Sequence, residues 1–235
     1  MQFERTPYER AFAIQGWMTR EELGFLYTLA TRLPDEASVV EVGNWKGRST
    51  IAICEGLRSK RAPRLYAVDT FLGDEGMRQR HRDEILQGAI YNEFLGNTSE
   101  YPFVHVLRLD SVRASRTVED RSIDWVFIDA EHTYEQVSAD ITAWFPKLRP
   151  GGIISGHDFG RFEVRRAVRA HLEIEGVEGS IWYAQRRARR RTRAPASAPI
   201  DVKLRAVVRS APLADRAWSS FRKAMQRLRR VDRCR

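Results

Sequence analysis

The sequence predicts a doubly wound α/β fold on a mostly parallel sheet, followed by a basic C-terminal extension. Apolar runs of strand length alternate with segments of helical periodicity along most of the chain. Acidic residues end several of these runs, where a parallel sheet presents the carboxyl ends of its strands. The run over 123–129 is nearly continuous in apolar residues, which is typical of a strand covered by helices on both faces.

The first helix is expected after Thr19, because Thr19 and Glu22 form a capping box and Pro34 ends the apolar periodicity that follows. Met18 is placed to pack onto Leu23. Apolar runs bounded by polar turns predict strands over 38–42, 64–69, 103–110, 123–129, 153–156 and 180–185. Helical spacing predicts helices over 49–58, 77–95, 134–148 and 162–172, with a turn at 149–152 and with Trp144 and Phe145 in the core.

Charge divides the chain into unequal parts. The 235 residues carry 40 Lys and Arg against 31 Asp and Glu. Residues 186–235 hold 17 of these bases and 3 of the acids, which leaves 23 bases against 28 acids in the rest. We therefore divide the chain into an N-terminal helical segment (1–37), an α/β domain (38–185) and a basic linker with an amphipathic tail (186–235). The net charge of +9 informs about partners of the tail and not about the chemistry of the domain.

The segment 39–50 predicts a buried strand, a glycine turn and a helix N-terminus. Gly43 and Gly47 lie four residues apart, so the second and third glycines of the dinucleotide motif are replaced by Trp45 and Arg48. The Walker pattern also fails, because no Gly-Lys-Ser/Thr follows. This pattern suits a smaller ligand with an amino-acid end.

Three polar groups could contact such a ligand. Glu41 can face an ammonium group, and Ser49 with the helix N-terminus can face a carboxylate. Asp69, at the end of the second strand, can bridge the diol of a ribose.

These segments together resemble the class I S-adenosylmethionine (AdoMet)-dependent methyltransferases over about 39–185. The stretch 39–49 looks like the first AdoMet-binding motif, Asp69 like the ribose-binding acid, and Asp110 with Ser111 like the adenine-contacting position. The stretches 127–135 and 148–152 are similar to bacterial small-molecule O-methyltransferases, including macrolide-sugar enzymes, and more distantly to catechol O-methyltransferase. The resemblance implies a Rossmann-like class I methyltransferase fold and AdoMet as cofactor.

The resemblance also implies the residues that carry the chemistry. In the similar enzymes the acid ending the fourth strand binds a divalent metal and a basic residue three positions later takes the substrate proton; here these are Asp129 and His132. The second half of the metal site would be His157 and Asp158, where the family usually has two acids or Asp-Asn. Imidazole suits softer metals than Mg²⁺, and His157 could instead be a second base or a substrate contact.

Structural alternatives exist for several of these residues. Asp110 and Ser111 could simply begin a helix as an N-cap pair. His132 could be a solvated residue at a helix start. Asp74 and His81, in the region after the second strand, could lie over the substrate or belong to ordinary surface.

Three functions follow, in order of preference. The first is AdoMet-dependent methylation of a hydroxyl on a small molecule or glycoside, metal-assisted with a His base. The second is a nucleic-acid methyltransferase guided by the basic tail, although Asp129-Ala-Glu-His132 replaces the Asp/Asn-Pro-Pro-Tyr/Phe of amino-group enzymes. The third is a non-catalytic module that docks on a membrane or partner protein.

The tail and the cellular location complete the expectations. Residues 217–231 could form a helix with one apolar and one basic face, which favours an anionic membrane surface or a partner protein over nucleic acid. No apolar run approaches the roughly 18 residues of a membrane span, and the N-terminus lacks the pattern of a signal peptide. We expect a cytoplasmic protein, with a peripheral membrane position open to it through the tail.

Overall fold

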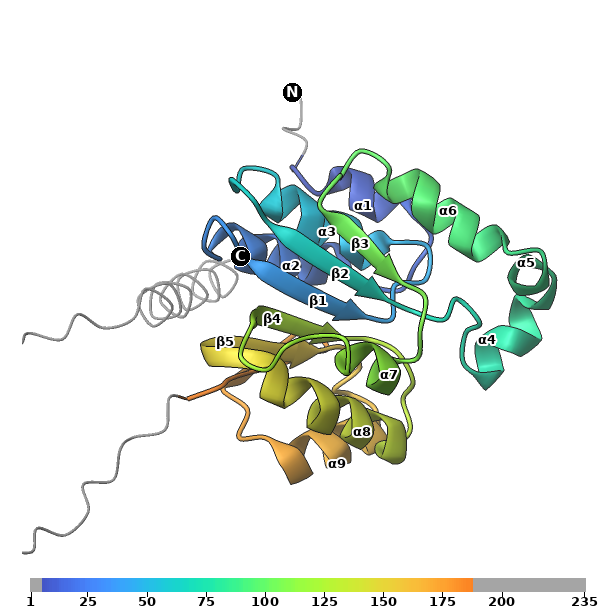
Figure 1. Cartoon of the computed structure of the whole chain (residues 1–235). Helices are drawn as coiled ribbons and strands as arrows, with labels where there is room; N and C mark the ends of the chain where they lie inside the picture. The colour runs from blue at the N-terminus through green and yellow to red at the C-terminus, as the bar shows by residue number, and fades with distance from the viewer. Residues whose placement is uncertain (1–5, 188–235) are drawn as a thin grey trace, which may run out of the picture.

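A seven-stranded sheet in the order β3-β2-β1-β4-β5-β7-β6 forms the centre of the molecule (Figure 1). The computed structural model describes residues 6–187. The strands are β1 (Ser38–Val42), β2 (Arg64–Val68), β3 (Val104–Leu107), β4 (Ile123–Ile128), β5 (Leu148–Gly156), β6 (Gly176–Glu178) and β7 (Ile181–Gln185). Strands β1 to β5 are parallel, and β7 is antiparallel to both β5 and β6. The predicted mostly parallel, doubly wound sheet is confirmed.

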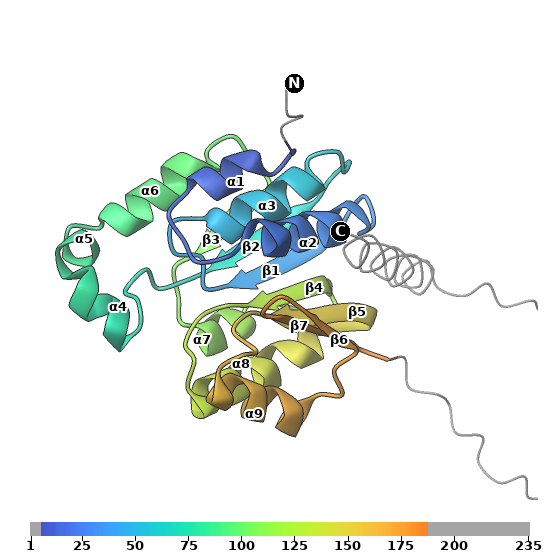
Figure 2. The same ribbon diagram turned by 180° about the vertical axis from the view of Figure 1, so that it is seen from behind.

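Helices cover both faces of this sheet, as Figures 1 and 2 show from opposite sides. One layer contains α1 (Glu9–Ala13), α2 (Arg20–Thr31), α3 (Arg48–Leu57) and α6 (Ala89–Thr98). The other contains α7 (Ser111–Ser115), α8 (Tyr134–Trp144) and α9 (Phe162–His171), and a 3₁₀ turn (Phe145–Lys147) follows α8. Two short helices, α4 (Glu75–Arg80) and α5 (Arg82–Leu86), project beyond the carboxyl ends of the strands.

The core follows from the two-residue period of strands buried on both faces. In β4, Trp125 and Phe127 pack toward the layer of α2 and α3, while Val126 and Ile128 pack toward α8 and α9. All four side chains are buried. Trp144 belongs to the second core as expected, whereas Phe145 is only half-buried.

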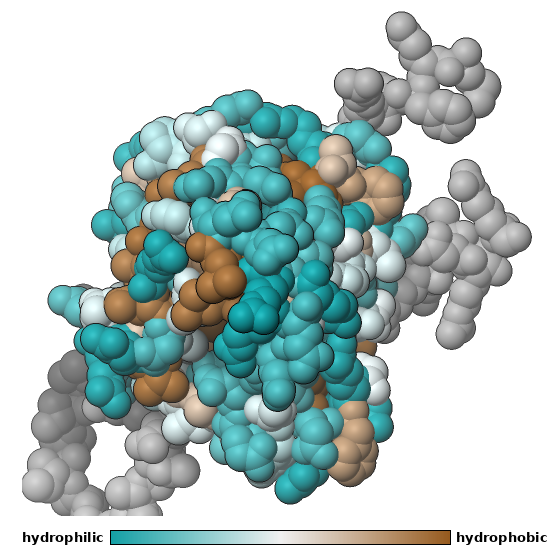
Figure 3. Space-filling model, turned by 90° about the vertical axis from the view of Figure 1, so that its right-hand side faces the viewer, coloured by the Kyte–Doolittle hydropathy of each residue, from teal (hydrophilic) through white to brown (hydrophobic). Residues whose placement is uncertain are grey.

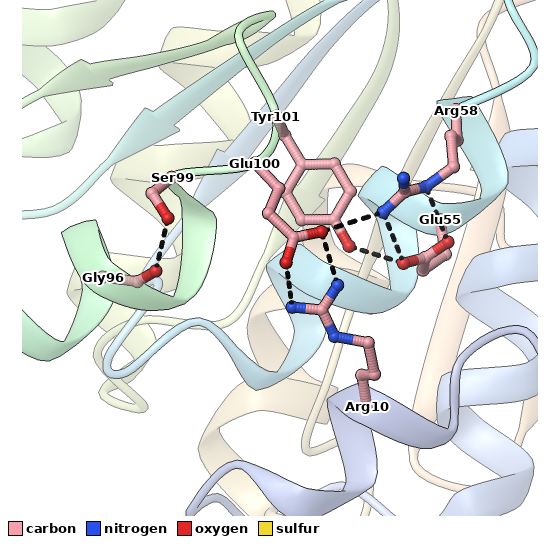
Figure 4. A network of polar contacts seen from close by, with 7 residues as sticks. All are labelled: Arg10, Glu55, Arg58, Gly96, Ser99, Glu100 and Tyr101. Carbon is pink, nitrogen blue, oxygen red and sulfur yellow. Dashed lines mark hydrogen bonds and ion pairs between the residues drawn. The ribbon is translucent and has the colours of Figure 1, made fainter.

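The N-terminal segment is held against the α/β domain by a polar network (Figure 4). Arg10 of α1 donates to both carboxylate oxygens of Glu100, at 2.6 and 2.8 Å. Arg58 and the hydroxyl of Tyr101 both donate to Glu55 of α3, at 3.0 and 2.5 Å. Exposed ion pairs contribute little free energy singly; this network adds a polar contact between α1, which leads into residues 15–18 at the site described below, and the chain that follows α6.

The capping box at the start of α2 is confirmed in full. The hydroxyl of Thr19 accepts from the amide of Glu22 at 3.2 Å, and the Glu22 carboxylate accepts from the amide of Thr19 at 2.9 Å. Met18 and Leu23 are both buried in the first core. The sequence signal therefore placed this helix start correctly.

Several expected elements were wrong in detail. The single helix over 77–95 is three helices, because the chain leaves the helical conformation at His81 and takes a left-handed turn at Gly88 (φ +69°). The turn at 149–152 is a bulge within β5, where Gly151 has φ +86° and the register against β4 shifts. Helix α1 and strand β6 were not predicted, because each is too short to show a period.

Apart from Arg186 and Arg187, the expected basic linker lies outside the described residues, as does the expected tail helix over 217–231. Within residues 6–187, no helix combines the length and the apolar character needed to cross a bilayer.

Candidate active site

A cavity of about 620 Å³ opens at the carboxyl edge of the sheet, around the point between β1 and β4 where the strand order reverses. Figure 3 faces this side of the molecule and shows apolar patches enclosed by hydrophilic residues. The wall includes the loops after β1, β2, β4 and β5, the start of α7, and residues 15–18. Ligands bind at such reversals in open α/β sheets, and the volume suits a nucleoside-sized ligand.

The loop after β1 is shaped by glycine. Gly43 has φ +86°, and a Cβ there would lie 2.1 Å from the carbonyl oxygen of Asp129, so no other residue fits. Gly47 has φ +95° at the N-cap of α3 and packs against Phe94. Gly43 belongs to the cavity wall and Gly47 does not, so direct contact of Gly47 with a cofactor stays a prediction.

Asp69 holds this loop from the end of β2. Its Oδ2 accepts from the amides of Asn44 at 2.7 Å and Trp45 at 3.1 Å, and its Oδ1 accepts from the amide of Phe71 at 2.6 Å. The carboxylate lines the cavity and keeps acceptor capacity for a ligand, since each oxygen has two lone pairs.

Glu41 lies behind the loop and is fully buried. Its Oε2 accepts from the Asn44 amide group at 2.7 Å and the Thr50 hydroxyl at 2.6 Å, while Oε1 has no partner among the described residues. Burial raises the pKa of Glu41 to about 7. Glu41 is absent from the cavity wall, although Ser49 beside it is part of that wall. The structure thus gives Glu41 a bracing role, and its contact with an ammonium group stays a prediction.

The far end of the cavity is formed by the start of α7 and by α8. Asp110 is an N-cap, since its Oδ1 accepts from the amide of Arg113 at 2.9 Å, so the structural alternative for this residue is real. Ser111 accepts from Nε1 of Trp144 at 2.8 Å. Both Asp110 and Ser111 also line the cavity, as the binding hypothesis requires.

Two histidines and three acids meet beside the end of β5. Nε2 of His132 lies 2.8 Å from Oδ2 of Asp158, and Nδ1 of His157 lies 3.3 Å from the same oxygen. His157 Nδ1 is 3.7 Å from Asp129 Oδ1, and its Nε2 is 3.3 Å from Oε1 of Glu22. Asp158 has φ +58°, a left-handed conformation that Asp tolerates better than most residues.

The charges in this cluster stabilise one another. Burial disfavours the ionised forms, but hydrogen bonds from His132 and His157 hold the pKa of Asp158 far below its usual range. Burial is likewise outweighed at His157, where Asp158 and Glu22 raise the pKa to about 10, and at Glu22, where His157 lowers the pKa to about 2. Asp158 also raises the pKa of His132 against burial, whereas burial raises the pKa of Asp129.

Asp129, His132 and Asp158 offer ligand atoms within 4.8 Å of one another, so they could hold a cation. The predicted set contained His157 in place of His132, but the structure turns His157 toward Glu22. Two carboxylates and an imidazole fit a divalent transition metal better than Mg²⁺.

The loop residues after β2 separate in the structure. Asp74 lines the cavity, with Oδ2 3.8 Å from Nδ1 of His132. His81 lies outside the wall; its ring packs edge-on against Trp45, and its Nδ1 is 2.8 Å from Glu84. Asp74 therefore faces the cavity, whereas His81 does not, and contact of Asp74 with a substrate stays a prediction.

The residues at the site that the sequence reasoning missed include Glu22, Gln136 and Asp140. Glu22 showed only a capping role, and its contact with His157 spans 135 positions of the chain. Gln136 and Asp140 of α8 line the cavity, one helical turn apart. A buried acid between Val137 and Ile141 on the apolar side of this helix is a signal that could have identified Asp140.

This fold, with a cavity at this edge of the sheet, is the fold of the class I methyltransferases, which use AdoMet as cofactor. Residues 40–159 match the family model described as "Methyltransferase domain". The chain belongs to that methyltransferase family.

One curated relative and two solved structures illustrate what the chain is similar to. Protein y4gI of Sinorhizobium fredii (strain NBRC 101917 / NGR234) is 31% identical over 145 residues, which are 61% of this chain but only 15% of that relative. The structure of the O-methyltransferase NovP matches with a TM-score of 0.55 at 18% identity. The match covers 72% of this chain and 80% of the NovP chain. An O-methyltransferase from Thermotoga maritima that depends on SAM (AdoMet) matches with a TM-score of 0.54 at 11% identity. The match covers 79% of this chain and 72% of that protein's chain. These two likenesses show the fold.

The residues that line the cavity also fit AdoMet, independently of the similar proteins. Gly43 and Asp69 both line the cavity, so the acid that is expected to contact the ribose is accessible to a ligand there. Nε1 of Trp45 and Oδ2 of Asp140 are buried polar atoms without a partner among the described residues, and both side chains belong to the wall. A polar ligand of this size would supply the missing partners.

Proposed function

We propose that this protein transfers the methyl group of AdoMet to a hydroxyl group of a small molecule, with His132 as general base. The His132–Asp158 contact in the cavity wall carries the proposal, because a hydroxyl is a weak nucleophile until a base takes its proton. NovP and the Thermotoga maritima protein, which share the fold, are named O-methyltransferases.

The chain would act through proton transfer and orientation. A hydrogen bond from Nε2 of His132 to Asp158 leaves Nδ1 as the proton acceptor. When bound, AdoMet would supply an electrophilic methyl group on a sulfonium, with a neutral thioether as the leaving group. Nδ1 of His132 would take the proton of the acceptor hydroxyl as its oxygen forms the new bond to the methyl carbon. Asp158 stabilises the imidazolium that forms.

Asp129 and Asp158 would also hold a divalent cation beside His132. Such a cation would lower the pKa of a bound hydroxyl and orient it. Because imidazole is adjacent, we expect Mn²⁺ to support turnover better than Mg²⁺.

The test compares His132→Ala with His171→Ala, an exposed histidine at the end of α9. Purified variants are screened with labelled AdoMet against sugars, glycosides and phenols. We expect His132→Ala to bind S-adenosylhomocysteine normally and to lose turnover by about 100-fold or more, with His171→Ala unaffected. Full turnover in His132→Ala would reject the base role.

Chelation with EDTA, followed by addition of Mn²⁺ or Mg²⁺, tests the cation separately. If turnover withstands EDTA, the proposed role of the cation is rejected, and the role of His132 as base is unaffected. Failure of every hydroxylated acceptor, with cofactor binding intact, would reject O-methylation itself.

A further inference from the structure

Asp140 is an acid in an unusual position in α8. Its side chain is fully buried, yet it belongs to the wall of the cofactor cavity beside Ser111. Gln136, one helical turn earlier, donates its amide group to Oδ1 at 3.1 Å. Oδ2 has no hydrogen-bond partner among the described residues.

A buried carboxylate oxygen without a donor is costly, so a ligand that donates to Oδ2 would be favoured here. Burial raises its pKa to about 6, although Ser111 and Gln136 oppose the rise, so the group is mainly ionised at pH 8. An ionised carboxylate can only accept hydrogen bonds. The ligand group that completes this site must therefore be a donor.

The position of Asp140 indicates which part of the cofactor supplies that donor. Asp69, the expected ribose contact, ends β2, while Leu109 to Ser111 follow the neighbouring strand β3 and share the cavity wall with Asp140. The nucleobase therefore extends from the ribose toward α7 and α8. Adenine carries an exocyclic amino group, which is a hydrogen-bond donor.

We infer that Asp140 is a specificity residue that accepts a hydrogen bond from the exocyclic amino group of the cofactor's adenine. Hypoxanthine has a carbonyl oxygen at this position, and two acceptors would then face each other without a proton. The site should therefore reject an inosyl cofactor. This inference rests on the cofactor of the family and is independent of the proposed acceptor and base.

The test is a calorimetric comparison of S-adenosylhomocysteine with S-inosylhomocysteine at pH 8. We expect the wild-type protein to bind the adenosyl compound about 30-fold more tightly or better. In Asp140→Asn the ratio should fall below about 5-fold, because a carboxamide can turn its NH₂ group toward the carbonyl of hypoxanthine. Asp124→Asn, a buried acid at the amino end of β4, should keep the wild-type ratio.

Several outcomes would overturn the inference. Equal loss of affinity for both compounds in Asp140→Asn would mean a purely structural role, and an unchanged ratio would exclude contact with the base. If Asp140→Asn does not fold, the wild-type ratio decides, and a value near one refutes the inference. A wild-type protein that binds neither compound would refute the cofactor assignment as well.

Discussion

Nε2 of His132 lies 2.8 Å from Oδ2 of Asp158, and this contact joins the loops that follow the neighbouring strands β4 and β5. The left-handed backbone of Asp158 carries its carboxylate to this position. Arg161 holds the other oxygen, with Nε 3.0 Å from Oδ1. The carboxylate is thus fixed on both sides, and the imidazole that it orients is fixed with it.

Asp158→Asn should lower turnover by about 100-fold, because the carboxamide neither stabilises the imidazolium nor holds its tautomer. The affinity for S-adenosylhomocysteine, measured by calorimetry, should change by less than about threefold, since Asp158 lies away from the Asp69 loop. Single-turnover rates separate the chemical step from product release. A large loss of cofactor affinity with normal single-turnover chemistry would contradict the assigned role.

Asp69→Asn should impair cofactor binding and stability together. One carboxylate accepts from three backbone amides, and a carboxamide oxygen can replace only part of this arrangement. We expect the affinity for S-adenosylhomocysteine to fall at least about 10-fold and the free energy of unfolding to fall by about 1–3 kcal/mol. Denaturant titration measures the second quantity. Normal cofactor binding in this variant would remove Asp69 from the site.

Glu41 should make the protein less stable at high pH. Its carboxyl is fully buried and its pKa is raised to about 7, so the folded state binds a proton more tightly than the unfolded state. This stabilisation is complete below the ordinary pKa of Glu and is lost as the pH rises through 7. Between pH 5 and pH 8 the free energy of unfolding should therefore fall by about 2 kcal/mol more in the wild type than in Glu41→Gln. Parallel pH profiles would contradict this assignment.

The sequence predicted most of the sheet and several residues of the cavity wall, because both depend on local patterns. Apolar runs mark buried strands, and the residue that ends a parallel strand lies at the ligand-binding edge. The sequence alone therefore predicts that Asp69, Asp129 and Asp158 lie at the same edge of the sheet. The partners of these acids could not be predicted in the same way. Side-chain directions decide whether His132 or His157 offers a ligand atom beside Asp129 and Asp158.

Other site residues belong to contacts that no local pattern encodes. Glu22 carries a complete capping-box signal, and nothing nearby in the sequence indicates that its second oxygen reaches His157. Its Oε1 also accepts from the amide of Ser180 at 2.7 Å, which ties α2 to the turn before β7. Such a residue is found only when the packing of distant elements is known.

Alanine substitutions at Gly43 and Gly88 can separate the cost of a strained backbone from an effect on cofactor binding. Both have positive φ, but a Cβ at Gly43 would lie 2.1 Å from the Asp129 carbonyl oxygen, whereas a Cβ at Gly88 would meet nothing within 4 Å. Gly88→Ala should therefore cost only the left-handed conformation, about 1–2 kcal/mol, and should keep the affinity for S-adenosylhomocysteine. Gly43→Ala should lower the free energy of unfolding by more than this, because the loop must move away from the chain after β4. It should also abolish binding of S-adenosylhomocysteine, because the same loop contains the amides that donate to Asp69. Denaturant titration and calorimetry on both variants measure these effects. Equal destabilisation with intact binding in both would show that the loop adapts and that its close approach to β4 is not needed for the cofactor.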